Sequence, residues 1–251
     1  MAALTELVRY ADEYLRIGTI QDYENSLNGL QLENGGEVHK IGAAVDASSR
    51  SIAAAAQTGI DFLVVHHGMF WPGLRPITGA WHAQIKLALS HDLAIYSAHL
   101  PLDLHPVVGN NAQLVAVLGL KNTEPFFEAK GQPIGLRACG NGSRDELVKR
   151  LENSLGGPVK MFAAGPAEPK MIGVVSGGAG GEIYGVAREG VDTFITGEAP
   201  HWAAIAAEEL QINLLLGGHY ATETFGVKAF AAHLAERFNL PWEFIDHPTG
   251  L

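Results

Sequence analysis

The stretch DFLVVHHG, residues 61–68, contains a short continuous run of apolar residues that ends in two histidines and a glycine. Such a run is typical of a strand that is buried on both faces of a parallel sheet. His66 and His67 occupy the end of this predicted strand. Because ligands of parallel α/β sheets bind outside the carboxyl ends of the strands, the two histidines mark a candidate functional site.

The chain around this stretch alternates predicted strands and helices. Apolar strands that alternate with amphipathic helices indicate parallel pairing, with helices covering the sheet. A short extended segment is also expected near Leu30. The expected strands are 41–47, 61–67, 94–99, 134–140, 159–165, 170–177, 191–197, 212–218 and 242–246, and the expected helices are 2–16, 49–59, 79–90, 110–120, 143–156, 181–190, 200–210 and a last one carrying Val227 to Phe238.

A break in this alternation predicts two domains. Residues 121–133, KNTEPFFEAKGQP, bring together charges and two prolines, and the strand and helix pattern then restarts. We therefore expect an α/β protein of two α/β units with mainly parallel or mixed sheets flanked by helices. Residues 1–125 plus 215–251 would form a metal-binding domain and residues 126–214 a second α/β domain, with the C-terminal segment returning to the first unit.

Composition and charge narrow the functional classes. The chain has 251 residues, of which 47% are hydrophobic and 18% charged, and this is the composition of a folded globular protein. No apolar stretch approaches the roughly 20 residues that cross a bilayer. The net charge of −10 argues against binding to extended nucleic acid. The single cysteine and the lack of a secretory signal pattern predict a cytoplasmic location.

Histidines and carboxylates recur at three predicted strand ends. His99 and Asp103 follow the strand 94–99, and His219 and Glu223 follow the strand 212–218 with the spacing of one helical turn. Imidazole with carboxylate suits zinc, iron or manganese. The full set exceeds what one tetrahedral ion needs, so a pair of divalent ions about 3.5–4 Å apart is expected. The set comprises His66, His67, His99, Asp103, His219 and Glu223.

Simpler interpretations exist for several of these residues. A single histidine after a strand is more often a hydrogen-bonded residue than a ligand. Asp46, at the end of the strand 41–47, is interpreted first as a helix cap and second as a support for the site. Glu198 is interpreted as a first-turn residue that interacts with a helix dipole. The glycine-rich turn 176–181 either cradles an anion or only permits tight packing.

Five segments together resemble one known family. They are NGLQ (28–31), VVHHGMFW (64–71), SAHLPLDLHPVVGNNAQLVAVLGL (97–120), VDTFITGE (191–198) and GGHYATETFGVKAF (217–230). In this order and at these separations they resemble the NGG-interacting-factor-like family, whose bacterial members are called GTP cyclohydrolase 1 type 2 homologues. The resemblance covers nearly the whole chain.

The resemblance implies a site and an assembly. It implies a two-domain α/β chain that forms a toroidal homohexamer, with two divalent metal ions per chain (iron, zinc or manganese). The metal ligands carried over by motif are His66, His67, Asp103, His219 and Glu223. His99 would lie beside the metals, where it would handle protons or orient a water.

Two functional hypotheses follow. The first is a metal-dependent hydrolase that acts on a small nucleotide or phosphorylated heterocycle, with ring opening of GTP as the reaction that the family name suggests. The second is a non-catalytic metal-binding scaffold or metal-trafficking protein. A catalytic site keeps coordination positions open, whereas a structural site is closed by protein ligands and supports the fold.

Overall fold

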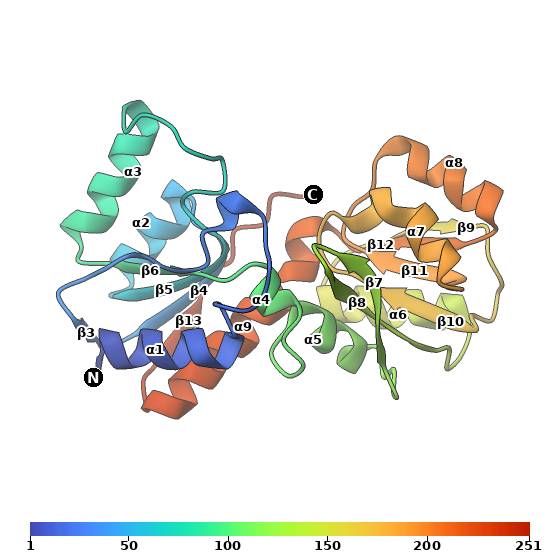
Figure 1. Ribbon diagram of the computed structural model, residues 1–251, viewed down its shortest axis with the longest axis horizontal. Helices are drawn as coiled ribbons and strands as arrows, with labels where there is room; N and C mark the ends of the chain where they lie inside the picture. Colours follow the sequence, from blue (N-terminus) through green and yellow to red (C-terminus); the bar gives the residue numbers. More distant parts are fainter. The chain divides into compact units, whose positions relative to one another are not determined.

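The computed structural model describes residues 1–251 and groups them into two compact units (Figure 1). The first unit comprises Met1–Val108 and Gly226–His247, and the second comprises Gly109–Phe225 and Pro248–Leu251. Each unit contains one main β-sheet with flanking helices. The predicted α/β class with mixed sheets is therefore confirmed.

The sheet of the first unit is built around the strand predicted from DFLVVHH. Strand β5 (Phe62–His67) is buried along its whole length and pairs in parallel with β4 (Ile41–Asp46) and β6 (Ala94–Ser97). The C-terminal strand β13 (Trp242–Phe244) returns to pair in parallel with β4, as predicted. Strand β2 (Gly29–Leu32) closes the other edge in the antiparallel direction.

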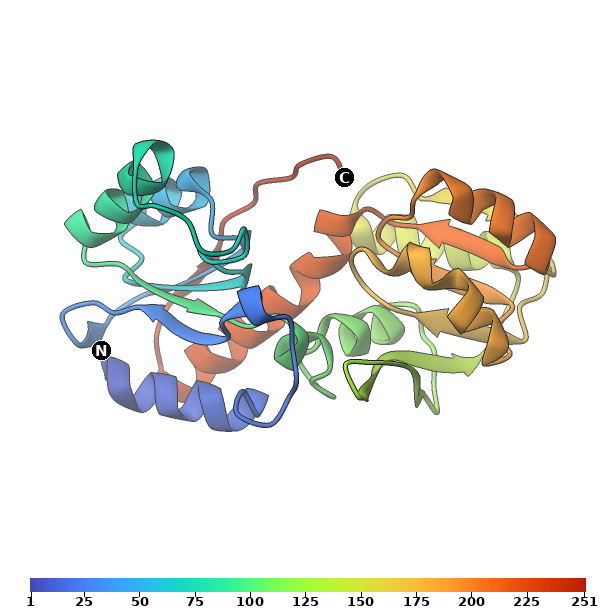
Figure 2. The same ribbon diagram turned by 45° about the horizontal axis from the view of Figure 1, so that its top comes forward.

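Helices cover both faces of this sheet (Figure 2). On one face, Leu63 and Val65 of β5 belong to the same core as residues of α2 (Ser49–Gln57) and α3 (Gly79–Ser90). Successive strand residues point to opposite faces, so Phe62 and Val64 point the other way.

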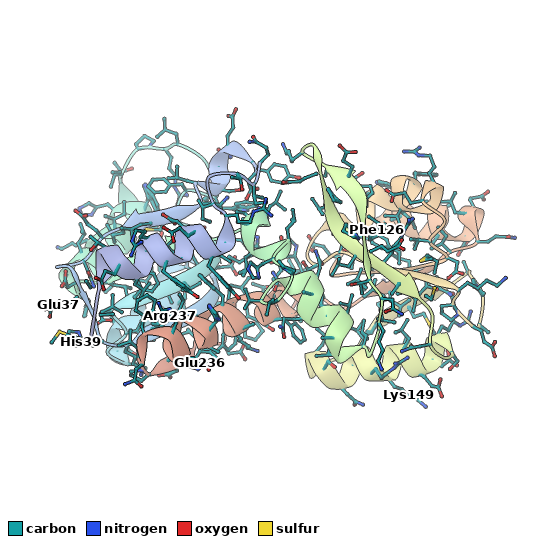
Figure 3. The ribbon with its side chains drawn as sticks, turned by 60° about the horizontal axis from the view of Figure 1, so that its bottom comes forward. Glu37, His39, Phe126, Lys149, Glu236 and Arg237 are labelled. Carbon is teal, nitrogen blue, oxygen red and sulfur yellow. The ribbon has the colours of Figure 1, made fainter.

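The second face is covered by α1 (Leu4–Leu15) and by α9 (His219–Phe238). Tyr96 of β6 contacts Phe230 of α9 with ring centroids 6.2 Å apart, and its hydroxyl donates to Asp12 of α1 at 2.8 Å. The two helices also contact each other, and Arg237, labelled in Figure 3, lies over the ring of Tyr10 at 5.3 Å. The sheet is thus the middle of three layers.

The second unit has a six-stranded mixed sheet and two cores. Phe126, labelled in Figure 3, and Phe194 pack with residues of α7 (Ile183–Arg188) and α8 (His201–Leu210) on one face. The other face packs against α5 (Asn110–Val117) and α6 (Arg144–Leu155). In spatial order the strands are β7 (Glu124–Ala129), β8 (Gln132–Cys139), β10 (Met171–Val174), β11 (Thr193–Thr196), β12 (Asn213–Leu216) and β9 (Lys160–Ala163).

The segment 121–133 is structured differently from the expected linker. It contains β7 and the turn of a hairpin with β8, and β7 is the edge strand of the sheet. Pro125 is tolerated there because an edge strand leaves some backbone groups outside the ladder. The compact units also group residues 109–125 and 215–225 with the second unit, since Leu114 and Leu215 belong to the same core.

No helix has both the length and the hydropathy that a bilayer-spanning segment needs.

Several short elements complete the chain. The short elements are β1 (Ala2–Ala3), which pairs with β3 (Glu37–Val38), η1 (Glu24–Ser26), α4 (Leu100–Asp103) and η2 (Ala179–Glu182).

Candidate metal centre

Three histidines meet at the carboxyl edge of the first sheet. His66 and His67 are the last residues of β5, and His99 follows β6 by two residues. One ring nitrogen of each lies within 4.8 Å of a ring nitrogen of the others. All three side chains are buried, and His66 has no exposed surface. The structure therefore brings together the histidines that the sequence analysis placed at two separate strand ends.

Asp103 adds a carboxylate to this cluster. It is the last residue of α4, a single turn that begins just after His99. Its Oδ2 lies 3.5 Å from Nε2 of His66, and its side chain is 10% exposed. A short helix after the strand thus returns the chain to the sheet edge and places oxygen beside nitrogen.

An oxygen atom holds Nδ1 of each of the three histidines. Nδ1 of His66 lies 2.9 Å from the carbonyl of Ala98, and Nδ1 of His67 lies 3.0 Å from Oδ1 of Asp46. Nδ1 of His99 lies 2.8 Å from Oδ1 of Asp22. A carbonyl or carboxylate oxygen accepts a hydrogen bond and does not donate one, so Nδ1 carries the hydrogen in each ring. The neutral rings then present Nε2 with its lone pair, which is how histidines are held in metal sites.

The partner of His99 is a firmly ionised carboxylate. Burial alone would raise the pKa of Asp22, but the hydrogen bond and charge of His99, together with Asn28 and the Tyr23 amide, lower this pKa to about 2. Asp22 also accepts a hydrogen bond from the Leu100 amide at 2.9 Å. The His99 ring is therefore fixed in both position and tautomer.

In the second unit, a histidine and a glutamate share one face of α9. His219 is the first residue of the helix, and its Nε2 lies 3.1 Å from Oε1 of Glu223, as the four-residue spacing predicted. Nδ1 of His219 lies 2.9 Å from Oε1 of Glu198. Burial would lower the pKa of His219, but Glu223 and Glu198 raise it to about 9. Positive charge is therefore stabilised at this position.

The glycine turn of residues 176–178 shapes the seat of Glu223. Gly177 has φ +68°, and a Cβ there would overlap Oε1 of Glu223. The Gly177 amide donates to Oγ1 of Thr222 at 3.0 Å, and its carbonyl accepts from Oγ1 of Thr196 at 3.1 Å. The turn allows the backbone to pass close to the carboxylate, so close packing explains its glycine.

Sequence reasoning missed or misinterpreted three supporting carboxylates. For Asp46 the sequence favours a helix cap and gives support of the site as the alternative. Ser48 caps α2 through a reciprocal bond with Ser51, and Asp46 contacts His67, as the alternative expects. The dipole interpretation of Glu198 is replaced by its contact with His219. Asp22 carries no signal, because it lies in a loop far from His99 in sequence. For Asp46, the signal that could have identified its contact with His67 is its position at the end of β4, opposite His67 on β5.

The donor chemistry of each group, taken by itself, fits a divalent metal. The first unit supplies imidazole nitrogens and the carboxylate of Asp103, and the second supplies His219 and Glu223. Nitrogen with carboxylate oxygen is the ligand mixture of zinc, iron and manganese sites. Oxygen partners behind metal-binding histidines orient the rings and raise their basicity.

Comparisons with known proteins identify the family. The family model of Duf34/NIF3 (NGG1p interacting factor 3) matches residues 2–249. A protein of Deinococcus radiodurans named GTP cyclohydrolase 1 type 2 homolog is 40% identical over 98% of this chain and 94% of its own length. A protein of the same name from Pyrococcus abyssi is 41% identical over 98% of both chains.

A solved structure agrees over the full length. The crystal structure of the protein TTHA1606 from Thermus thermophilus is 39% identical, covers 100% of both chains and superposes with a TM-score of 0.89. Sequence and fold thus match the same group of proteins along the whole chain. The chain belongs to the Duf34/NIF3 (NGG1p interacting factor 3) family.

Proposed function

We propose that the chain is a metal-dependent hydrolase that uses a pair of divalent cations on a small nucleotide or phosphorylated heterocycle. The observation that carries the proposal is the histidine cluster of the first unit, where each Nδ1 is held by an oxygen and Nε2 is the donor atom. The proposed ligands are His66, His67 and Asp103 of the first unit and His219 and Glu223 of the second.

The chemistry that such a pair supplies is the activation of water near neutral pH and the polarisation of the substrate. The protein's own contribution is orientation. Asp46 and Ala98 hold His67 and His66 with Nε2 at the sheet edge, and Glu198 does the same for His219. Rings held in this way keep their orientation when a cation binds, and His219 would release a proton from Nε2.

His99 is the proposed proton-handling residue. Its Nδ1 donates to the ionised Asp22, so its Nε2 accepts a proton and Asp22 stabilises the imidazolium that results. This arrangement lets His99 take a proton from water and return it to a leaving group. Hydrolytic ring opening of a guanine nucleotide, which the names of the relatives suggest, needs both transfers.

The proposed setting is a cytoplasmic homohexamer. The family resemblance supports the hexamer, and the single cysteine supports a reducing compartment. The partner that we propose is a small-molecule substrate. The net charge of −10 supports the exclusion of extended nucleic acid.

Metal analysis of the purified protein tests the proposal. We expect about two equivalents of divalent metal per chain, as two-metal hydrolases hold. The His66→Ala/His67→Ala variant should lose this metal together with hydrolysis of nucleotides and phosphoesters. His82→Ala, on the exposed side of α3, is the matched histidine control and should keep both.

The outcomes separate the two functional hypotheses. Metal with turnover supports the hydrolase. Stoichiometric metal without turnover on a broad substrate panel would favour the scaffold or trafficking protein. Absence of metal after reconstitution with iron, zinc and manganese would refute both.

A further inference from the structure

We propose that Trp71 and Tyr23 form an aromatic wall beside the histidine cluster, on which a planar heteroaromatic ring of the ligand stacks. The inference rests on the proposed function and extends it, because it names the part of the ligand that the protein recognises. Neither residue belongs to the proposed metal ligands. Both lie in the first unit, and so does the histidine cluster beside them.

The ring geometry places the wall directly against the cluster. The ring centroid of Trp71 lies 4.5 Å from that of His99 and 4.7 Å from that of His67. Tyr23 lies 5.9 Å from His99 and meets Trp71 edge to face, with centroids 6.4 Å apart and planes at 77°. These contacts make one continuous aromatic surface that begins at the histidines.

The wall is open to incoming molecules. Tyr23 is 50% exposed, and Trp71 is partly exposed, whereas the histidines beside them are buried. Contiguous exposed apolar surface often marks a ligand-binding site. A surface that is buried at the histidines and open at Tyr23 fits a ligand that enters past the tyrosine and stacks on the face of Trp71, with Tyr23 at its border.

Hydrogen bonds hold the two loops that carry these rings. The side-chain amide of Gln31 donates to the carbonyls of Ser26 and Leu27, at 3.2 and 2.9 Å, and its oxygen accepts from the Met69 amide at 2.6 Å. Gln31 therefore links the turn after Tyr23 to the segment before Trp71. Both loops are fixed to the same side chain, so the spacing of the two rings is set before a ligand arrives.

A hydrogen bond from its backbone amide also holds Tyr23 in place. The amide of Tyr23 donates to Oδ1 of Asp22 at 2.7 Å, and the same oxygen lies 2.8 Å from Nδ1 of His99. One carboxylate thus orients the proposed proton-handling residue and the start of the wall. Because Asp22 binds both, the position of the Tyr23 backbone is fixed relative to the His99 ring.

The chemistry of the wall favours a heteroaromatic ring over other groups. Electron-rich faces of Trp and Tyr stack well on flat, electron-poor heterocycles, and such stacking tolerates different substituents on the ring. A phosphate has no ring face that could stack on this surface. The proposed ligand class is therefore a compound with a purine-like ring.

A matched pair of probes tests the stacking. GMP and ribose 5-phosphate differ by the ring, and their binding to the metal-loaded protein is measured by calorimetry. Trp71→Ala should weaken GMP binding roughly 5- to 100-fold, the range expected from removing a stacked aromatic. Ribose 5-phosphate binding should not change. Trp71→Phe should recover part of the GMP affinity, and the exposed Trp202→Ala in the second unit should bind GMP like the unchanged protein.

Metal content is measured on every sample, and the titrations are repeated on chelator-treated protein. Equal binding of GMP and ribose 5-phosphate to the unchanged protein would overturn the inference, and so would an equal loss of both in Trp71→Ala. If metal is bound but GMP affinity ignores Trp71, the wall fails while the metal proposal stands. If no metal binds and Trp71→Ala still selectively weakens GMP, the wall stands without the metal centre.

Discussion

The role of each histidine in the cluster is set by the atom behind it. A histidine at a strand end has two ring nitrogens, and only a fixed partner on one decides which nitrogen faces the ligand. Asp46 does this for His67, and the carbonyl of Ala98 does it for His66. The supporting atoms therefore define the site as much as the histidines do.

Replacing Asp46 should weaken metal binding without unfolding the protein. In Asp46→Ala, the His67 ring loses its acceptor and is free to rotate or change tautomer, so we expect metal affinity to fall by roughly 10- to 100-fold. Competition with a chromogenic chelator measures this fall. Asp145→Ala removes an exposed carboxylate in the second unit and should leave the affinity unchanged. Equal affinities for both variants would contradict the orienting role.

Gly68 is required by a side chain and not by its backbone angles. A Cβ at this position would overlap the amide of Gln31, which three hydrogen bonds hold in place. We expect Gly68→Ala to lower the free energy of unfolding by about 1–3 kcal/mol, as overpacking does, in urea titrations. Most of that loss should be absent when the change is made in a Gln31→Ala background. Additive effects of the two substitutions would show that the clash is not the cause.

Residue types and spacing identified the metal-binding candidates, but not their supports. His66, His67 and His99 could be assigned to strand ends because each follows a short apolar run that stops at a polar residue. Asp22 and Glu198 could not be placed, because each acts on a histidine far away in sequence. Only the tertiary structure brings such pairs together. For Glu198, the sequence also offered a local explanation, the interaction of a first-turn residue with a helix dipole.

Elements buried on both faces were predictable, and elements at the edges were not. Strand β5 begins one residue after the expected start and ends where expected, because a strand buried on both faces has a continuous apolar run. Helix α3 also has the expected bounds, although most of its residues are exposed. Strand β7 resembles a linker in sequence, since its proline and its charges are acceptable at the edge of a sheet. The single-turn α4 is too short to have a period of its own.

The packing of α1 against α9 should depend on pH through His233. Tyr14 stacks on His233 with centroids 4.1 Å apart, and the Tyr10 hydroxyl lies 2.7 Å from Nε2. Burial lowers the pKa of His233, an effect that Glu236 opposes and Arg237 reinforces. The unfolded chain therefore binds this proton first, and stability falls as the pH drops below the unfolded value near 6.5.

Removing this titration should make the protein less sensitive to acid. His233→Phe keeps a ring for Tyr14 and cannot be protonated, so we expect it to lose less stability than the unchanged protein from about pH 7.5 to about pH 5.5. Urea midpoints at the two pH values measure the difference. His82→Phe, at an exposed site of α3, should retain the original pH dependence. The same acid loss in both variants would remove His233 as the cause.

At the scale of the whole molecule, the assembly is open to direct measurement. Six copies of the 26.7 kDa chain would sediment as a particle of roughly 160 kDa, and closed rings keep this mass on dilution. We expect sedimentation velocity to show this single species at micromolar concentrations. A species of one or two chains under the same conditions would contradict the proposed hexamer and leave the metal centre to be judged separately.

The proposed metal ligands belong to two units that have separate cores, and whether zinc protects both groups of ligands can be measured. Hydrogen exchange provides this measurement. Adding zinc to the metal-free protein should slow exchange in the segment 63–71 of the first unit and in the segment 217–223 of the second. A ligand that binds only the folded arrangement stabilises every group that holds it.

A second prediction is that a substitution in segment 217–223 changes the protection of segment 63–71. Glu223→Ala removes a proposed ligand of the second unit. If the five proposed ligands hold the same ions, it should also reduce the zinc-induced protection of segment 63–71. Glu208→Ala, on the exposed side of α8, is the control and should preserve the protection of both segments. If segment 63–71 were protected equally in both variants, the first unit would bind its metal alone. The histidine cluster would then be a complete site, and His219 with Glu223 would need a different explanation.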